Sequence, residues 1–282
     1  MKLIAIDLDG TLLSSRMTIS KQNIEAIKLL QRKGHIVMIC SGRAPEDIKE
    51  IVEKYDLDCP IAGSNGSVVY VNQKCIHSTS MNLVSLEKTY NLLEELNFPF
   101  KIYTNDGIYI PKTWQKRVLK LISIDENVLD QFSDEQIKLM TEQPKESVIE
   151  KEIDSRTDLS RLTVQKFFIL TFHEQTKKHL IQQLDSVEKI AITTSGPFNV
   201  EVMDINGNKY RGLKAVAEYY NIPLENTVAI GDNFNDLPML EKAGTSIAMA
   251  NGDPEIKKRC HYHTLTNDKD GVAFAIEKFI LT

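Results

Sequence analysis

Strand-like and helix-like patterns alternate at both ends of this 282-residue chain, and this alternation constrains its fold more than any other feature. Apolar runs at 3–8 and 35–40 read as buried strands. Each is followed by a stretch with apolar residues three or four apart, between Ser20 and Gly34 and from Pro45 to Tyr55. The same order returns near the C-terminus, where apolar spacing predicts a helix over 213–220. We interpret 257–263 as a solvated helix end, because its spacing fits no metal-ligand pattern. Repeated strand–helix units predict an α/β fold, in which helices cover both faces of a parallel sheet.

The middle of the chain follows a different pattern. Alternating apolar residues flank Asn105-Asp106-Gly107, which predicts a hairpin, and two more strands are expected within 189–204. The stretch 125–161 is polar and has no clear periodicity. We therefore predict an α+β module with largely antiparallel strands, inserted into the α/β core. The predicted boundaries are 1–81 and 205–282 for the core and 82–204 for the insert.

Composition and charge argue against several classes of function. The net charge of −5 and the pI near 5.8 disfavour nucleic acid or an anionic membrane as the main partner. No run approaches the roughly 20 apolar residues of a transmembrane helix, and we expect no signal peptide. Cys40, Cys59, Cys75 and Cys260 show no CxxC spacing, so we expect reduced thiols in a cytoplasmic protein. The oligomeric state cannot be predicted from these features.

Polar and small residues follow the predicted core strands at their carboxyl ends, where open α/β sheets bind ligands. Asp7 and Asp9 follow the first strand, Ser41-Gly42-Arg43 the second and Ser64-Asn65-Gly66 the third. Residues 231–236 follow a later strand, "TVAI". Each motif by itself is commonly an ordinary turn or cap. Their joint position at successive strand ends predicts one ligand site.

The acids of this set predict a metal. Asp7, Asp9, Asp232 and Asp236 would repel one another by about 4 kcal/mol per pair at ~4 Å and an effective dielectric of 20. A cation would relieve this repulsion. Oxygen ligands without His or Cys select a hard ion, Mg²⁺ first, and Mg²⁺ typically binds phosphate as well.

These residues resemble a known family. The segments "DLDGTLL", "SGR", a later lysine and "GDNFNDLPML" are similar to the four motifs of the haloacid dehalogenase-like superfamily. The insert, and the "SNG" after the third strand, resemble its Cof-type branch, in which a large cap lies between the second and third motifs. The resemblance extends from end to end of the chain. It implies a Rossmann-like core, with a cap that selects the substrate.

The resemblance also implies a catalytic pair and a metal shell. Asp7 would attack phosphorus and form an aspartyl-phosphate. Asp9 would be the general acid and then the base, with its carboxyl free for proton transfer. Mg²⁺ would be held by Asp7, the Asp9 backbone carbonyl and Asp232, with Asn233 or Asp236 in or near its shell.

Phosphate contacts follow from the same resemblance. The family lysine matches Lys209, although Tyr210 stands where glycine is usual, and Lys214 is the alternative. Arg43 either holds substrate or pairs with an acid. The other expected phosphoryl contacts come from the Leu8 amide, Ser41, Gly42 and Asn235.

The function predicted from these residues is a Mg²⁺-dependent phosphatase of small phosphorylated metabolites, such as a sugar phosphate, a nucleotide or a cofactor phosphate. A sugar phosphomutase is the first alternative, because Asp9 would serve both reactions. A non-enzymatic phosphate-sensing protein is the second. Receiver domains of that kind are much shorter, however, and phosphorylate an acid that follows a later strand.

Overall fold

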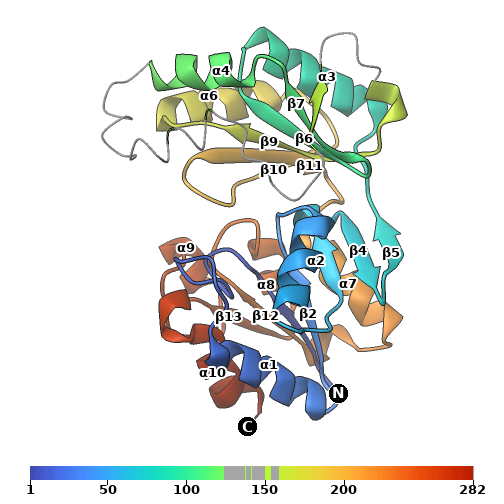
Figure 1. Cartoon of the computed structure of the whole chain (residues 1–282), viewed down its shortest axis with the longest axis vertical. Helices are drawn as coiled ribbons and strands as arrows, with labels where there is room; N and C mark the ends of the chain where they lie inside the picture. The colour runs from blue at the N-terminus through green and yellow to red at the C-terminus, as the bar shows by residue number, and fades with distance from the viewer. Residues whose placement is uncertain (124–136, 138–140, 142–149, 154–158, 282) are drawn as a thin grey trace. The chain divides into compact units, whose positions relative to one another are not determined.

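The computed structural model describes residues 1–123, 137, 141, 150–153 and 159–281 (Figure 1). The chain divides into two compact units. The core unit comprises residues 1–78 and 207–282, and the inserted unit comprises residues 79–206. Most of the polar stretch 125–161, which the sequence left unassigned, lies outside the described residues.

The described strands of the core unit form one sheet, whose parallel part confirms the α/β prediction. Strands β14 to β3 are parallel, and β4 and β5 extend the sheet as an antiparallel hairpin. The order across the sheet is β14 (Tyr262–His263), β13 (Thr245–Ala248), β12 (Thr227–Gly231), β1 (Leu3–Ile6), β2 (Ile36–Cys40), β3 (Ile61–Gly63), β4 (Val68–Val71) and β5 (Lys74–Ser78).

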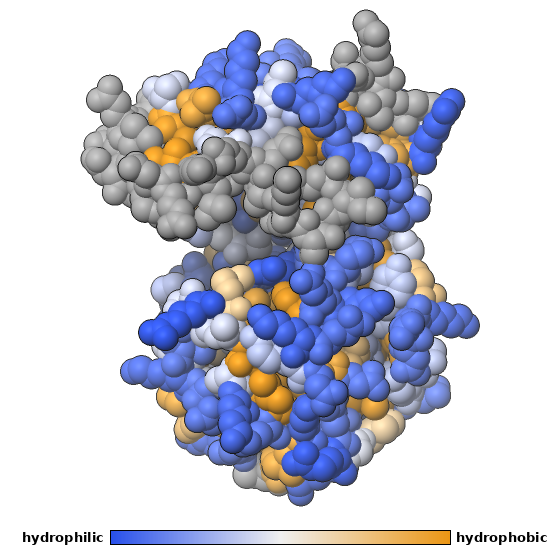
Figure 2. All heavy atoms as spheres, in the orientation of Figure 1, coloured by the Kyte–Doolittle hydropathy of each residue, from blue (hydrophilic) through white to orange (hydrophobic). Residues whose placement is uncertain are grey.

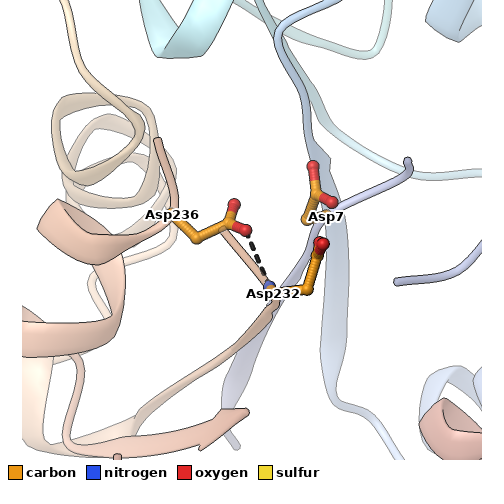
Figure 3. Close-up of side chains that lie close together, drawn as sticks. All are labelled: Asp7, Asp232 and Asp236. Carbon is orange, nitrogen blue, oxygen red and sulfur yellow. Dashed lines mark hydrogen bonds between the residues drawn. The ribbon is translucent and has the colours of Figure 1, made fainter. Parts of the chain in front are cut away.

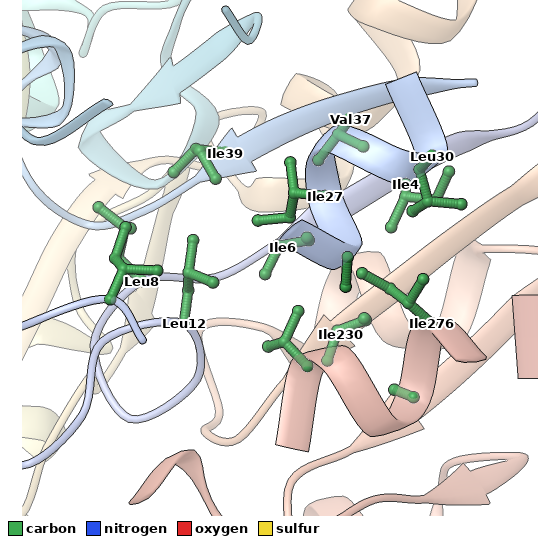
Figure 4. Packing of buried hydrophobic residues seen from close by; sticks show 14 of the residues in the cluster. Ile4, Ile6, Leu8, Leu12, Ile27, Leu30, Val37, Ile39, Ile230 and Ile276 are labelled. Atoms are coloured by element: carbon green, nitrogen blue, oxygen red, sulfur yellow. The ribbon is translucent and has the colours of Figure 1, made fainter. Parts of the chain in front are cut away.

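Helices cover both faces of this sheet, because the side chains of β1 alternate between two apolar layers. Ile4 and Ile6 pack on one side with residues of α1 (Lys21–Arg32), α2 (Pro45–Lys54) and α10 (Gly271–Ala275), which a π-helical turn (Ile276–Ile280) continues (Figure 4). Leu3 and Ala5 pack on the other side. The helices there are α7 (Lys209–Tyr219), α8 (Leu237–Lys242) and α9 (Pro254–Lys258).

Two details of the core unit differ from the sequence prediction. Helix α7 begins at Lys209, whereas apolar spacing predicted a helix from Leu213. Its first turn has no apolar repeat and starts instead at the cap Asn208, whose side chain accepts the N–H of Arg211. A short strand, β14, also occupies part of 257–263, where the sequence predicts a solvated helix end.

The inserted unit is an α+β module with mostly antiparallel strands, as predicted. Helices α3 (Leu83–Glu95), α4 (Trp114–Ile122) and α6 (Glu174–Leu184) pack on one side of its sheet (Figure 1). Among the described strands of the inserted unit, only β7 and β8 form a parallel pair. The strand order is β10 (Ile190–Thr193), β11 (Asn199–Asp204), β9 (Val164–Leu170), β6 (Phe100–Thr104), β7 (Gly107–Pro111) and β8 (Glu150–Ile153).

Large apolar side chains are mostly buried within each unit. On the face of the core unit shown in Figure 2, hydrophilic side chains cover much of the surface, with apolar ones between them. Among the described residues, no helix has the length and apolar character needed to cross a membrane.

Candidate active site

The parallel register of the core sheet brings the predicted motifs to one edge. Ile6 lies opposite Ile230 at the ends of β1 and β12, and the Asp7 N–H donates to the Ile230 carbonyl over 3.1 Å. At the end of β2, the Ser41 N–H donates to the Ala62 carbonyl of β3 over 2.9 Å. The residues that follow these strands therefore come from distant parts of the sequence and lie at one edge of the sheet.

Three carboxylates form an acidic group at this edge (Figure 3). Asp7, Asp232 and Asp236 each place one carboxylate oxygen within 4.8 Å of the others. Asp7 is only 4% exposed and Asp236 is fully buried. The backbone N–H groups of Asp232 and Asn233 donate to Asp236 Oδ2 over 2.9 and 3.0 Å, so the loop after β12 holds this carboxylate in place.

Lys209 lies between two of these acids. Its Nζ is 2.5 Å from Asp7 Oδ1 and 2.5 Å from Asp236 Oδ1, and its side chain is fully buried. Burial alone would lower the pKa of Lys209, but Asp236 and Asp7 raise it above its usual value, so the lysine is charged. The competing Lys214 pairs instead with Glu218, over 3.5 Å.

Burial also shifts the pKa values of two of these carboxyl groups. It raises the pKa of Asp7 well above its usual value, with Asp236 adding to the effect and Lys209 opposing it. Burial, and then Asp236, raise the pKa of Asp232 to about 7. Three carboxylates and one ammonium leave two negative charges in excess when all are ionised. This hard-oxygen, negatively charged set fits Mg²⁺.

The carboxylate of Asp9 pairs with the guanidinium of Arg43. Arg43 Nε and a terminal guanidinium nitrogen donate to its two oxygens over 2.8 and 2.7 Å. Arg43 follows β2, the neighbour of β1 in the sheet, so the two side chains meet across adjacent strand ends. Of the two roles that the sequence left open for Arg43, the structure shows pairing with an acid.

The predicted phosphate contacts lie at the same edge of the core sheet. Ser41 is buried, and its Oγ accepts the Arg43 N–H over 3.2 Å, with Gly42 between the two. Asn235 Nδ2 donates to Asn65 Oδ1 over 3.2 Å. The Leu8 side chain packs in the apolar core, which leaves only its backbone for a ligand. Asn233 Oδ1 accepts the Phe234 N–H over 2.8 Å, so that this side chain serves its own loop.

Two further polar residues belong to this site, although the sequence analysis did not assign them a role. Thr11 is fully buried, and its hydroxyl donates to Asp232 Oδ1 over 2.9 Å. Asn65 is also buried and has a left-handed φ of 57°, which turns the chain sharply after β3. Both residues lie within motifs quoted above, "DLDGTLL" and "SNG". Their position in these motifs could have identified them as site residues.

Glycine at position 10 leaves room for the Asp232 carboxylate of the same acidic group. Its φ of +82° favours glycine, and a Cβ there would collide with the carboxylate of Asp232. The tight turn after Asp9 therefore depends on the absence of a side chain.

Comparisons with known proteins show what the whole chain resembles. Residues 4–276 match the family model described as haloacid dehalogenase-like hydrolase. The chain is 33% identical to the 5-amino-6-(5-phospho-D-ribitylamino)uracil phosphatase YwtE of Bacillus subtilis, covering 99% of this chain and 98% of the relative. It is 31% identical to phosphatase YwpJ of the same organism, covering 99% and 100%. A solved haloacid dehalogenase-like hydrolase from B. subtilis superposes with a TM-score of 0.86 at 28% identity, covering 99% and 100%.

Proposed function

This chain belongs to the haloacid dehalogenase-like hydrolases, and we propose that it is a Mg²⁺-dependent phosphatase of small phosphorylated metabolites. Two of its relatives are named phosphatases, and its resemblance to the family implies an attacking acid directly after the first core strand. The observation that carries the proposal is the buried Lys209, joined to Asp7 and Asp236 at the carboxyl edge of the sheet. A charged lysine beside a carboxylate suits a site for a dianionic phosphoryl group.

Asp7 is the proposed nucleophile. One of its carboxylate oxygens attacks phosphorus, and the bond from phosphorus to the ester oxygen breaks. The leaving oxygen keeps the electron pair of that bond and takes a proton from the Asp9 carboxyl. A water then attacks the aspartyl-phosphate and gives a proton back to Asp9, which releases phosphate and restores Asp7.

The residues proposed to hold Mg²⁺ are Asp7, the Asp9 carbonyl and Asp232. When bound, the ion would offset the repulsion between the carboxylate and the phosphate. Asp236 is a weaker candidate for a ligand, because its oxygens already accept from Lys209 and two backbone N–H groups. The Asn233 side chain is engaged with the Phe234 N–H.

Phosphoryl oxygens would be bound by donors at the same edge. The ammonium of Lys209 is the charged donor, and its position at the first turn of α7 adds backbone amides nearby. The neutral donors proposed are the Leu8 amide, the Ser41 hydroxyl, the Gly42 amide and the Asn235 side chain.

We further propose that the insert, with predicted boundaries 82–204, selects the organic group of the substrate. Small phosphorylated metabolites are the proposed partners rather than nucleic acid. A cytoplasmic site of action is supported by the four cysteines, none of which forms a disulfide.

A panel of phosphorylated metabolites, assayed for phosphate release with and without Mg²⁺, tests the proposal. The phosphorylated ribitylamino-uracil named for YwtE belongs in the panel beside sugar phosphates, nucleotides and flavin mononucleotide. We expect Mg²⁺-dependent release of free phosphate from at least one substrate. An isomerised sugar phosphate would favour the mutase instead, and phosphorylation without turnover would favour a sensor.

A further inference from the structure

The ion pair between Asp9 and Arg43 is more exposed to solvent than the buried ion pairs of Lys209 near it. Both carboxylate oxygens are engaged, at 2.7 and 2.8 Å, by two nitrogens of one planar guanidinium. A two-point contact of this kind fixes the orientation of a carboxylate as well as its position. The Asp9 side chain nevertheless stays 45% exposed, so one side of it is open to a ligand.

The backbone of Arg43 is fixed on both sides. Its N–H donates to Ser41 Oγ over 3.2 Å, and its carbonyl accepts the Ser64 N–H over 2.7 Å. The segment also follows β2, which pairs with β1 in parallel register. The backbone from which the guanidinium extends is therefore fixed between two neighbouring strand ends, which limits how far the guanidinium can move.

The orientation of the Asp9 carboxylate matters because of its neighbours. Asp9 lies two residues from Asp7, beside the acidic group that is proposed to hold a divalent cation. A carboxylate that turned toward that cation would become another ligand and could no longer exchange a proton with the substrate. The guanidinium offers the Asp9 carboxylate a competing positive partner.

We propose that Arg43 is a positioning residue for the proton transfer by Asp9. Its fork receives the Asp9 carboxylate formed when the leaving oxygen takes the proton, and holds it for the water of the second step. The inference rests on the proposed function, since it concerns one step of that reaction.

Leaving groups of different basicity test the inference. The oxygen of a nitrophenyl phosphate leaves without needing a proton, whereas the oxygen of an alkyl phosphate does need one. In R43Q we expect kcat/KM to fall by about 100-fold for the alkyl phosphate identified by the panel, as for lost general acid catalysis. For p-nitrophenyl phosphate we expect a loss of less than about fivefold, because only that catalysis is removed.

Three variants make the test specific. D9N should show the same dependence on the leaving group, and R43Q should add nothing to that dependence in the D9N background. R43K keeps the charge without the fork, so it should recover activity only in part. R259Q is the matched control, because Arg259 forms an exposed pair with Glu241.

The outcomes separate the inference from the function on which it rests. Equal losses on both substrates in R43Q and R43K, or no loss on either, overturn the role of Arg43. So does a further change in leaving-group dependence when R43Q is added to D9N. If R43Q does not fold, as judged by its melting curve, R43K decides the matter by the same comparison. A wild-type protein inactive on the whole panel overturns the proposed function itself.

Discussion

Lys209 Nζ lies 2.5 Å from Asp7 Oδ1, and both side chains are buried at the carboxyl edge of the core sheet. The ammonium reaches this position because α7 begins at Lys209 itself, after the cap Asn208. A second bond, to Asp236 Oδ1, joins the lysine to the loop after β12. One cation thus links three segments that are distant in the sequence.

Replacing this lysine should damage both stability and catalysis. In K209Q, Asp7 and Asp236 lose their shared cation, and breaking a buried pair costs about 3–5 kcal/mol. We expect a lower melting temperature and a loss of kcat of at least about 100-fold, because the proposed charged donor to the phosphoryl group is removed. K214Q, which changes a lysine on the same helix paired with Glu218, is the control. Similar melting and kinetics in the two variants would contradict this assignment.

Asp7→Asn should separate folding from turnover. The amide is nearly isosteric and removes one charge from a group of acids that repel one another. Lys209 keeps its ion pair with Asp236, so the fold should persist. Phosphate release should stop, because an amide is a poor nucleophile toward phosphorus. Circular dichroism and a phosphate assay measure the two effects. Full activity in D7N would rule out Asp7 as the nucleophile, whereas D56N changes an exposed acid and should match the wild type.

The sequence predicted the order of core strands and helices well, because their apolar periodicities are strong and local. It placed Asp7 and Asp232 together through the rule that ligands bind at the carboxyl ends of parallel strands. Pairing of Arg43 with an acid was one of two open predictions, but Asp9 was not identified as that acid, because side-chain direction depends on the register of two strands and on neighbouring charges. The start of α7 was missed for a related reason: its first turn is defined by a polar cap, while periodicity detects only apolar residues.

The metal-free protein should lose stability as the pH rises. The folded-state pKa of Asp232 is raised to about 7, above the ordinary carboxyl value near 4 that applies when unfolded. The folded state therefore holds a proton that the unfolded state has released, and its benefit disappears as the pH rises through about 7. As a proposed ligand, Asp232 would bind Mg²⁺ in its ionised form, so the ion should stabilise the protein more at high pH than at low pH.

Melting curves across this pH range, with EDTA and with Mg²⁺, measure both effects. D232N removes the titrating group and should flatten the pH dependence of the metal-free protein, as well as reduce the effect of Mg²⁺. If the melting temperature of the wild type rises with pH in the presence of Mg²⁺, this indicates that metal is bound. A metal-free curve that rises between pH ~5 and ~7 would contradict the raised pKa.

Thr11 should tune the metal site through Asp232. Its buried hydroxyl donates to Asp232 Oδ1 over 2.9 Å, and this bond opposes the rise in the pKa of that carboxyl. In T11V the shape is kept and the donor is lost, so Asp232 should hold its proton more tightly and bind Mg²⁺ less well. Loss of such a supporting hydrogen bond typically weakens metal binding by about 10–100-fold. T11S keeps the hydroxyl and is the matched control.

Titration of Mg²⁺ against melting temperature and against phosphate release gives the two affinities for each variant. We expect T11V to need more Mg²⁺ in both measurements, with most of its kcat recovered at saturating metal, because the Thr11 hydroxyl donates to Asp232, a proposed metal ligand. T11S should stay close to the wild type. If T11V binds Mg²⁺ like the wild type, then the carboxylate of Asp232 does not depend on this hydroxyl when it binds the metal, and its place in the shell must be reconsidered.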